Sequence, residues 1–516
     1  MNNESLYKEF EKKKKKQLIS NDAAKVNKAH SKGKMTAQER LQELFDDGGY
    51  EETLPFRKNS CTNFDFYKNE FGNEGAITAF GNVNKRKTVA FANDVFNMGA
   101  SVGEAQGDKI CRSIDLAVKT GVPVIGLLEA GGARIQEGIA AIDAYCSIFG
   151  RTSIASGWIP QISVALGTCV GGAAYSSSLT DFIIMTESVS QLFITGPEVI
   201  KSVTYEDVTF EELGGSKVHS HKTGIAHFVA KDEKESIAIA KEILSFVPQN
   251  SKAKPPVYEN KDPLTRRIPE IRDVIPENPN RGFDVKKIIG PALDNNYFFE
   301  VQKDFATNIV IGFGRIAGKT IGIIANQPKI LAGCLNVDAS WKAARFVRFC
   351  DSFNIPLLTF ADCPGYLPGV TQEHNGIIRN GSKLLFAYSE ATVPKITVVM
   401  RKDYGGAYSA MCGKGMGADL MIAYPTAELA VMGAEGAANI IHKKEIAKAE
   451  DPEARRKELI EEYRKEYMNP YRGAEAGIVD DVIDPADTRV KLAEYFDMLG
   501  NKEQWMPYKK HSNIPL

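Results

Sequence analysis

The chain contains three segments that occur twice, in the same order and at nearly constant spacing. One segment, PQISVALGTCVGGAAY, begins at Pro160, and its counterpart, PKITVVMRKDYGGAY, begins at Pro394; in both, Gly-Gly-Ala starts eleven residues after the proline. Upstream, GVPVIGLLEAGGARIQEG matches NIPLLTFADCPGYLPG, and downstream TGIAHFVAKDEKESIAIAKEILSF matches AGIVDDVIDPADTRVKLAEYFDML. Three matches in order predict that the chain is a tandem duplication of one folding unit.

Each copy alternates short apolar runs with helical patterns. KTVAFAND, PVIGLLEA, QISVALG and DFIIMT are rich in β-branched residues, whereas GEAQGDKICRSIDLAVKTG has helical periodicity. This alternation predicts an α/β fold with buried strands. A stretch with seven prolines between Pro248 and Pro279 predicts a connector between the copies. We place the boundary near residue 255, which gives domains 1–255 and 256–516.

The first 50 residues predict a polar helical lead. Lys12–Lys16 form a lysine run that we expect to be a solvated helix face, with contact to an anionic partner as the alternative. Thr36 stands three residues before Glu39, which predicts a capping box at the start of a helix. Gly48 and Gly49 would end that helix.

Charge and hydropathy exclude several classes of protein. The 516 residues include 64 Lys and Arg against 65 Asp and Glu, so the chain lacks the basic excess that is typical of a nucleic-acid-binding protein. No apolar run approaches the roughly 18 residues that a membrane span needs, and MNNESLYKEFEKKKKKQ lacks the apolar core of a signal peptide. We therefore expect a cytoplasmic protein that does not bind nucleic acid.

Cysteine and histidine spacing indicates neither a metal site nor a redox pair. The eight cysteines occur singly and never as Cys-x-x-Cys, so we expect reduced thiols and no zinc ribbon. His219 and His221 form the only close histidine pair, and such a pair is more often surface or loop chemistry than half of a metal site. We assign no metal to the chain.

The repeated Gly-Gly-Ala is the strongest candidate for chemistry. It stands at Gly171–Ala173 and at Gly405–Ala407, each time between a buried strand and a helical pattern. Glycine lets the backbone turn sharply there, and a helix N-terminus offers unpaired N–H groups, so two such groups could bind an oxyanion. The alternative is that these glycines serve packing alone, but two copies in register favour a functional role.

Other glycine clusters and the polar residues leave the catalytic base unidentified. AGGARIQEG, DCPGYLPG and MGAEGA fit neither the P-loop nor the dinucleotide pattern, so they are either tight loops or loops shaped around a long ligand. No G-x-S-x-G elbow occurs, and Ser176–Ser178 lack a paired histidine at a telling spacing. A base that belongs to a bound cofactor would explain this absence.

Longer motifs resemble one family. AGGARIQEG, FITGPEVIKSVTYEDVTFEELGG, LPGVTQEHNGIIRNGSKLL, VMRKDYGGAY, YPTAELAVMGAEGA and the C-terminal KKHSNIPL are similar to the carboxyltransferase subunits of biotin-dependent acyl-CoA carboxylases. The nearest types are the propionyl-CoA carboxylase β chain, the methylmalonyl-CoA carboxyltransferase large subunit and the methylmalonyl-CoA decarboxylase α chain. The likeness runs from about residue 30 to the C-terminus.

The resemblance implies a fold and an assembly. The family has two crotonase-like ββα-superhelix domains, in agreement with the duplication, and forms hexamers whose sites lie between the N-domain of one subunit and the C-domain of another. Acyl-CoA would lie on domain 1–255 and biotin would enter on the side of domain 256–516. Carried over by motif, the catalytic donors are Gly171, Gly172, Gly406 and Ala407, and the substrate-binding residues are Gly131, Gly132, Ala133, Arg134, Ala173, Tyr175, Gly405, Tyr408 and Ser409.

The resemblance also implies a mechanism and partners. Carboxybiotin releases CO2, the biotin ureido anion removes the α-proton of the thioester, and the two oxyanion holes stabilise the enolate and the ureido oxygen. The chain has no Met-Lys-Met biotinylation site and no ATP-grasp-like loop, so biotin would come on a biotin carboxyl carrier protein. A biotin carboxylase subunit and the membrane subunits of a sodium-pumping decarboxylase remain open as further partners.

Two departures from the family pattern leave the substrate open. Leu128-Glu129-Ala130 stands where many relatives have Asn-Asp-Ser before GGARIQEG, and Ser409 stands where propionyl-type members commonly have Asp. The acyl pair could be propionyl-CoA and methylmalonyl-CoA or acetyl-CoA and malonyl-CoA, in carboxylation, transcarboxylation or decarboxylation. Outside the family, a crotonase-type hydratase or isomerase would need a catalytic Glu beside the glycines, and neither Gly-Gly-Ala has one adjacent. A non-enzymatic scaffold subunit of a biotin complex would have degenerate oxyanion holes, whereas Gly-Gly-Ala is intact in both halves.

Overall fold

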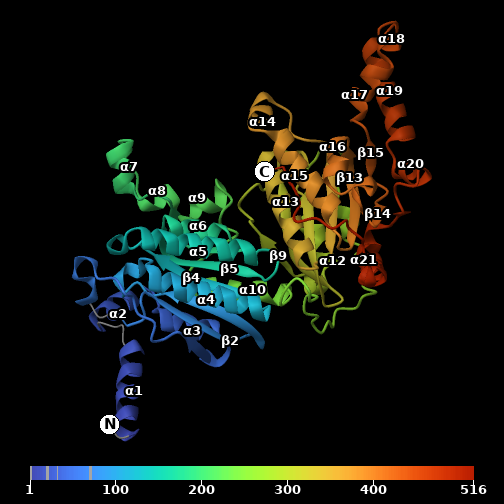
Figure 1. The fold of residues 1–516 in the computed structure, drawn as a ribbon. Coiled ribbons are helices and arrows are strands. Elements are labelled where there is room, and N and C mark those ends of the chain that lie inside the picture. The colour runs from blue at the N-terminus through green and yellow to red at the C-terminus, as the bar shows by residue number, and fades with distance from the viewer. Residues whose placement is uncertain (1–2, 19–22, 32, 69–71, 516) are drawn as a thin grey trace. The chain divides into compact units, whose positions relative to one another are not determined.

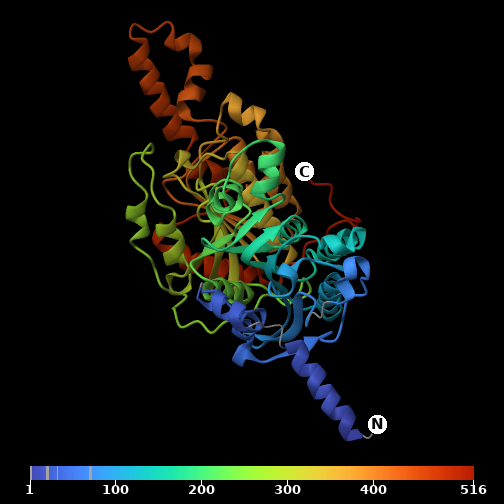
Figure 2. The same ribbon diagram turned by 90° about the vertical axis from the view of Figure 1, so that its left-hand side faces the viewer.

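The computed structural model describes residues 3–18, 23–31, 33–68 and 72–515. The chain divides into two compact units, Met1–Lys254 (unit 1) and Pro255–Leu516 (unit 2). Figure 1 and Figure 2 show the elements of each unit, coloured along the chain. Each unit is an α/β layer structure built on one twisted sheet, so the predicted fold class is confirmed.

The sheet of unit 1 has the strand order β1-β2-β3-β4-β5-β6-β8, and the short strand β7 pairs with β5. β1, β2 and β3 are antiparallel, and the pairs from β3 to β8 are parallel. The strands are β1 Tyr50–Thr53, β2 Ala76–Val83, β3 Arg86–Asn93, β4 Val124–Ala130, β5 Gln161–Val170, β6 Phe182–Thr186, β7 Gln191–Phe193 and β8 Phe228–Ala230. The α-helices are α1 Asn3–Leu18, α2 Ala23–His30, α3 Ala37–Leu44, α4 Glu104–Thr120, α5 Ile139–Ala155, α6 Gly172–Ser178, α7 Pro197–Val203, α8 Phe210–Gly214, α9 Ser216–His221 and α10 Glu233–Phe246.

The sheet of unit 2 repeats this order as β9-β10-β11-β12-β13-β14-β16, with β15 on β13. The strands are β9 Phe298–Val301, β10 Ile309–Ile316, β11 Lys319–Asn326, β12 Leu357–Cys363, β13 Lys395–Tyr404, β14 Leu420–Ala423, β15 Glu428–Ala430 and β16 Asp481–Val482. The α-helices are α11 Ile271–Val274, α12 Lys286–Ala292, α13 Val337–Ser352, α14 Val370–His374, α15 Ile377–Glu390, α16 Gly406–Ala410, α17 Ala434–Ile441, α18 Lys443–Ile446, α19 Pro452–Tyr467, α20 Pro470–Glu475 and α21 Thr488–Met498. The repeated topology is the structural counterpart of the repeated sequence.

The central strands are buried on both faces, because helices cover both sides of each sheet. Every residue of β4 and of β12 is buried, which explains their unbroken apolar runs. In unit 1, Val124 and Leu128 of β4 pack in one apolar cluster with Ile110 of α4 and Ile148 of α5, while α10 packs against α3 and against β5, β6 and β8. Between these layers β4 and β5 pair in parallel up to Ala130 and Cys169, so their ends lie side by side.

A buried lysine is part of the duplication. Lys109 of α4 donates to the carbonyls of Asn73 and Ala76, and Lys342 of α13 donates to the carbonyls of Gln302, Phe305 and Ile309 in the equivalent place. Burial lowers the pKa of Lys109 to about 8 and that of Lys342 to about 7. Both lysines tie a helix to the segment that precedes the second strand of the sheet.

The N-terminal region agrees with the sequence in part. Thr36 and Glu39 form the predicted capping box at the start of α3. The helix ends at Leu44, however, before the predicted Gly48, because Phe45 turns into an extended conformation and buries its ring against Gly81. Lys12–Lys14 are exposed on α1, as expected of a solvated face, while the side chains of Lys15 and Lys16 lie outside the described residues.

The main difference between the copies lies near the C-terminus of unit 2. Helices α17, α18 and α19 extend beyond the sheet of that unit in both views (Figure 1, Figure 2). Ala434, Ala438, Leu459 and Ile460 of this helical arm form an apolar cluster with Tyr404 of β13. The sequence KKEIAKAEDPEARRKELIEEYRKEY, which has no counterpart in unit 1, forms most of α18 and α19. None of the described helices is long and apolar enough to cross a membrane.

Candidate active site

Both Gly-Gly-Ala segments join a strand to a short helix in the same way. Gly171 follows β5 and precedes α6, and Gly405 follows β13 and precedes α16. Their φ angles are +58° and +55°, a region that favours glycine. The N–H of Gly171 donates to the carbonyl of Phe193 at 3.0 Å, and that of Gly405 to Ala430 at 2.9 Å. The first glycine therefore makes the turn and anchors it to the short edge strand.

The next two residues in each unit present N–H groups that have no acceptor within the described part of the chain. Gly172 and Ala173 are the first two residues of α6, and Gly406 and Ala407 are the first two of α16. Helix geometry gives these N–H groups no intrahelical partner, and no side chain of the described residues caps either helix. The sequence placed the pair in the N-terminal half at Gly171 and Gly172, but the Gly171 N–H is already bonded. The matching pairs are therefore Gly172–Ala173 and Gly406–Ala407.

A tyrosine lies beside the second glycine in each unit, at different distances. A Cβ on Gly172 would lie 2.6 Å from the ring of Tyr145 on α5, a distance shorter than real Cβ contacts. A Cβ on Gly406 would lie 3.5 Å from the ring of Tyr366, an ordinary van der Waals distance. Burial raises the pKa of both phenols, that of Tyr366 to about 12, so both rings are uncharged at neutral pH. Gly172 is thus the more constrained of the two glycines.

The loop Gly131–Gly138 follows β4 and lies beside the end of β5. Val102 donates to the carbonyl of Gly132, and Arg134 donates back to the carbonyl of Val102, each at 2.8 Å. Gly132 has a φ of +91°, and a Cβ on it would lie 3.6 Å from the carbonyl oxygen of Val170. Ala133 is thereby held between two backbone hydrogen bonds, next to the strand that leads to the donor pair. Gly131 at the start of the loop is exposed.

Arg134 lies in the interior of unit 1. Its side chain is 0% exposed and forms ion pairs with Glu137 at 2.6 Å and with Glu74 at 3.5 Å. It also donates to the carbonyl of Ser101 at 2.9 Å and lies over the ring of Phe66. The sequence suggested a substrate-binding role for Arg134. In the structure its guanidinium fixes the shape of the loop, and no part of the side chain is exposed for a ligand.

The remaining predicted site residues lie on the two short helices. Tyr175 is 53% exposed on α6 and packs edge-on against Phe149. The hydroxyl of Tyr408 on α16 accepts a hydrogen bond from the N–H of Lys414 at 3.0 Å. Ser409 follows on α16 and is half-buried. Each residue stands within one turn of the donor pair of its own unit.

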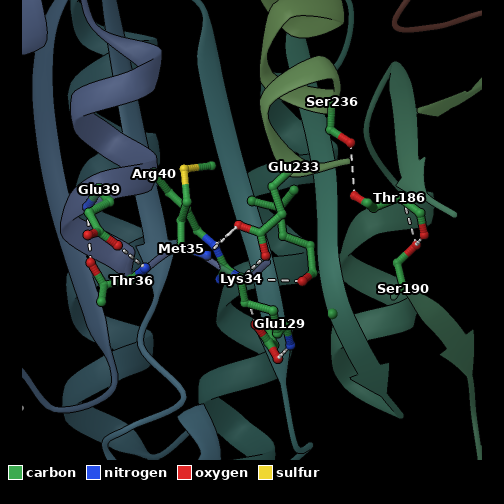
Figure 3. Close-up of polar contacts among 12 residues, drawn as sticks. Lys34, Met35, Thr36, Glu39, Arg40, Glu129, Thr186, Ser190, Glu233 and Ser236 are labelled. Atoms are coloured by element: carbon green, nitrogen blue, oxygen red, sulfur yellow. Dashed lines mark hydrogen bonds and ion pairs between the residues drawn. The ribbon is translucent and has the colours of Figure 1, made fainter. Parts of the chain in front are cut away.

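A buried charge cluster at the end of β4 was not predicted from the sequence (Figure 3). Arg40 of α3 donates to Glu129 at 2.8 Å and to Glu233 of α10 at 2.7 and 3.0 Å, and Lys34 also pairs with Glu129. The Glu129 side chain covers Gly167 of β5, where a Cβ would collide with its carboxylate. Two cations therefore balance two carboxylates. The departure from the family pattern at Leu128-Glu129-Ala130 drew attention to Glu129 in the sequence, but it did not predict Arg40 and Lys34 as the ion-pair partners of Glu129.

Unit 2 has a related arrangement at the end of β12. Asp362 pairs with Arg401 of β13 at 2.9 Å and accepts from the N–H of Lys402 at 3.1 Å. The backbone N–H of Asp362 donates to Asn326 of β11 at 3.2 Å, and the N–H of Glu129 donates to the equivalent Asn93 at 3.4 Å. The asparagine and the acid are repeated in both units, whereas the arginine comes from different elements.

His219 and most of the cysteines have hydrogen-bond partners or buried environments that do not form a metal site among the described residues. His219 of α9 contacts the carbonyl of Leu192 at 2.8 Å and the hydroxyl of Thr223 at 2.9 Å. Within the part of the chain that the structure describes, no three His, Cys, Asp or Glu side chains are grouped as metal ligands. Six of the eight cysteines are buried or half-buried with pKa values that burial raises; these are Cys111, Cys169, Cys334, Cys350, Cys363 and Cys412.

Comparison with known proteins places this chain in a family. Residues 28–514 match the carboxyl transferase domain family. The methylmalonyl-CoA decarboxylase subunit alpha of Propionigenium modestum is 48% identical over 98% of this chain and 98% of its own length. The propionyl-CoA carboxylase carboxyltransferase subunit of Haloferax mediterranei is 49% identical over the same shares of both chains.

Solved structures agree with the sequence match. A crystal structure of transcarboxylase 12S, described as a hexamer with methylmalonyl-CoA and methylmalonic acid bound, covers 100% of this chain and 99% of its own, with a TM-score of 0.98 and 47% identity. A single-chain long-chain acyl-CoA carboxylase has a TM-score of 0.81 at 26% identity and covers 96% of this chain. These findings confirm the resemblance and the crotonase-like fold that the motifs predicted. The chain belongs to the carboxyl transferase family of enzymes.

Proposed function

We propose that this carboxyltransferase moves a carboxyl group between biotin on a carrier protein and a short-chain acyl-CoA. The observation that carries the proposal is the repeated donor pair, because a transfer between two carbonyl compounds needs one oxyanion site for each. Gly172–Ala173 and Gly406–Ala407 supply two such sites with the same local geometry. The similarity to propionyl-CoA and methylmalonyl-CoA enzymes over nearly the whole chain supports the class of substrate.

Unit 1 would hold the acyl-CoA. The N–H groups of Gly172 and Ala173 would bind the thioester oxygen and stabilise the negative charge that develops on it as the α-proton leaves. The N-terminus of α6 adds a favourable partial positive charge. The loop Gly131–Gly138, which Arg134 holds from the interior, would form one wall of the site beside the end of β5. Tyr175 of α6, which is exposed, would lie at the solvent-facing side of this acyl-CoA site.

Unit 2 would hold the biotin group. Gly406 is exposed, and its N–H and that of Ala407 have no acceptor among the described residues, so the pair fits the oxygen of a urea ring. When bound, biotin supplies the carboxyl group and a ureido nitrogen that can take up a proton. The N–H groups of Gly406 and Ala407 would orient that ring and favour negative charge on its oxygen. Tyr408 and Ser409 would line the same helix.

The surrounding carboxylates argue against a hydratase. Such an enzyme needs a free Glu beside the oxyanion site. In unit 1, Glu129 and Glu137 are the carboxylates at the end of β4 and in the loop that follows, and both are buried in ion pairs with Arg40 and Arg134. Neither is available as a general base. The unpaired state that a base needs is thus missing from these two carboxylates of unit 1, which agrees with a reaction in which the second substrate brings the proton acceptor.

The proposal extends to assembly and partners. Each unit presents one donor pair, and the family resemblance implies that a complete site combines unit 1 of one copy with unit 2 of another in a homo-oligomer. A hexamer like that of the transcarboxylase 12S would provide such pairs. The partner would be a biotin carboxyl carrier protein, together with a biotin carboxylase subunit or with membrane subunits of a decarboxylase. The oligomer would work in the cytoplasm.

Incubation of the purified chain with a carboxylated biotin carrier and a panel of acyl-CoAs tests this function. We expect carboxyl transfer to acetyl-CoA or propionyl-CoA, seen as malonyl-CoA or methylmalonyl-CoA by mass spectrometry. Omission of the carrier is the control and should leave the thioesters unchanged. Hydration of crotonyl-CoA without the carrier would instead show a hydratase, and no reaction with any thioester would support a scaffold.

A further inference from the structure

Asp403 is the one buried acid near the unit 2 site that has no partner among the described residues. It lies on β13, two residues before Gly405, and is 1% exposed. Neither carboxyl oxygen has a hydrogen-bond partner. In register, Asp403 is paired with Cys363 of β12 on one side and with Leu429 of β15 on the other. Its side chain therefore stands in a low-dielectric environment at the strand end that leads into α16.

The charged groups around Asp403 are paired with other residues. Arg401 is paired with Asp362 and donates to the carbonyl of Arg281. Glu428 of β15 accepts the hydroxyl hydrogen of Tyr404. On the other packed elements the titratable groups are Asp362 and Cys363 of β12 and Tyr408 of α16, none of which is a cation. Burial, and then the charge of Asp362, raises the pKa of Asp403 well above its ordinary value.

The equivalent position in unit 1 shows that the fold does not require an acid here. Cys169 of β5 stands two residues before Gly171, as Asp403 stands before Gly405, and it is also fully buried. Burial raises the pKa of the Cys169 thiol to about 12, so that residue is uncharged. An acid that destabilises the fold and is replaced by a neutral residue in the other copy is expected to serve the site of its own unit.

The chemistry of the neighbouring donor pair suggests what that service is. The Gly406 and Ala407 N–H groups and the N-terminus of α16 attract negative charge. An ionised Asp403 would place a fixed negative charge at the end of the preceding strand, and a poorly screened charge there would repel an anion bound to the pair. A protonated Asp403 would not. We propose that Asp403 is a positioning residue of the unit 2 site, kept as an uncharged carboxylic acid so that Gly406 and Ala407 can bind an oxyanion, and that its ionisation weakens this binding.

This inference rests on the proposed function, and its first test is the pH profile of carboxyl transfer. From about pH 6 to about pH 9.5, we compare wild type with Asp403→Asn and with Asp403→Cys. The second variant introduces the residue type that unit 1 has at the equivalent position, Cys169. Wild-type kcat should fall about tenfold per pH unit once Asp403 ionises, while both variants stay active through that range. An alkaline limb that is the same in wild type and in both variants would overturn the proposal.

Two further readouts do not depend on transfer activity. A protonated carboxylic acid gives an infrared C=O band, which should be present in wild type at pH 7 and absent from Asp403→Asn. Because the folded-state pKa of Asp403 is raised, wild type should also lose stability relative to Asp403→Cys as the pH rises above about 4 towards that pKa. Absence of both signals would overturn the inference even in an active enzyme, whereas both signals in an inactive chain would remove only the proposed function.

Asp362→Asn is the matched control. Asp362 is equally buried but paired, so its substitution leaves Arg401 as an uncompensated buried cation and should lower the melting temperature at every pH. Asp403→Cys should instead raise the melting temperature at pH 8. If Asp403→Cys melts as low as Asp362→Asn, Asp403 has partners that stabilise the fold, and the proposal fails.

Discussion

At the scale of single residues, Gly172 and Gly406 occupy equivalent positions but have different space beside them. A Cβ at Gly172 would meet the Tyr145 ring at 2.6 Å, whereas a Cβ at Gly406 would meet Tyr366 at 3.5 Å. We predict that Gly172→Ala lowers kcat/KM about 100-fold or more, because the displaced helix turn misaligns both donors. Gly406→Ala should keep most of its activity. Steady-state kinetics with one thioester measures both effects.

Gly150→Ala is the control for this comparison, because Gly150 lies on α5, the helix that carries Tyr145, and a Cβ there meets no atom within 4 Å. It should keep full activity. Circular dichroism checks that all three variants are folded. Equal losses in Gly172→Ala and Gly406→Ala would mean that the tyrosine contacts do not determine the donor geometry.

Ser409 is the second prediction at this scale. It is half-buried on α16, two residues after Ala407, at the position where the resemblance to propionyl-type members implies Asp. The resemblance implies that this position of unit 2 borders the acyl chain bound on unit 1 of another copy. A pocket distinguishes acyl chains that differ by one methylene by only about 1–3 kcal/mol, so a small, uncharged residue there predicts relaxed selectivity. We expect acetyl-, propionyl- and butyryl-CoA to have kcat/KM values within about tenfold of one another. Ser409→Asp should increase the preference for one thioester.

The alternative for Ser409 is a neutral packing change that neighbouring side chains absorb. A wild type that already prefers propionyl-CoA strongly, together with no change in Ser409→Asp, would support that alternative and remove Ser409 as the selector. Ser382→Asp on α15 is a matched control, because Ser382 is in the same unit and its hydroxyl only bonds the carbonyl of Arg379 on the same helix.

At the scale of secondary-structure elements, Arg40 joins α3 to β4 and α10. Removal of its guanidinium would leave Glu233, at 3% side-chain exposure, without a cation, and Glu129, at 11%, with Lys34 as its one remaining cation among the described residues. We predict that Arg40→Ala destabilises unit 1 by about 3–5 kcal/mol, as measured by calorimetry of the full chain. Lys201→Ala, which breaks an exposed ion pair with Asp207, should leave the transition unchanged. A wild-type transition for Arg40→Ala would show that water compensates the cluster.

The elements also show what the sequence could and could not predict. The strand-to-helix junctions at Gly171 and Gly405 were predictable, because a buried apolar run, two glycines and a helical pattern are local signals. The bond from Gly171 to Phe193 was not, since it depends on β7, a strand of three residues that lies off the main path of the sheet. The Arg40 cluster joins residues as far apart as 34 and 233, and no local pattern links them.

At the scale of the whole molecule, the duplication explains how one chain can serve two substrates. Each unit repeats the same sheet, the same strand-end asparagine and acid, and the same pair of free N–H groups. The units differ where the two substrates would differ: Asp403 and the inserted segment that forms most of α18 and α19 belong to unit 2, whereas α17 follows β15 as α7 follows β7. A duplicated fold thus provides two oxyanion sites that can diverge independently.

The central claim is that each complete site combines the donor pair of unit 1 in one copy with that of unit 2 in another. Co-expression of two inactive variants, Gly172→Val and Gly406→Phe, tests it most directly. In randomly mixed oligomers about one site in four would pair an intact unit 1 with an intact unit 2, so we predict about a quarter of wild-type transfer activity. Mixed oligomers that are as inactive as each variant alone would contradict a shared site and place both donor pairs within one copy.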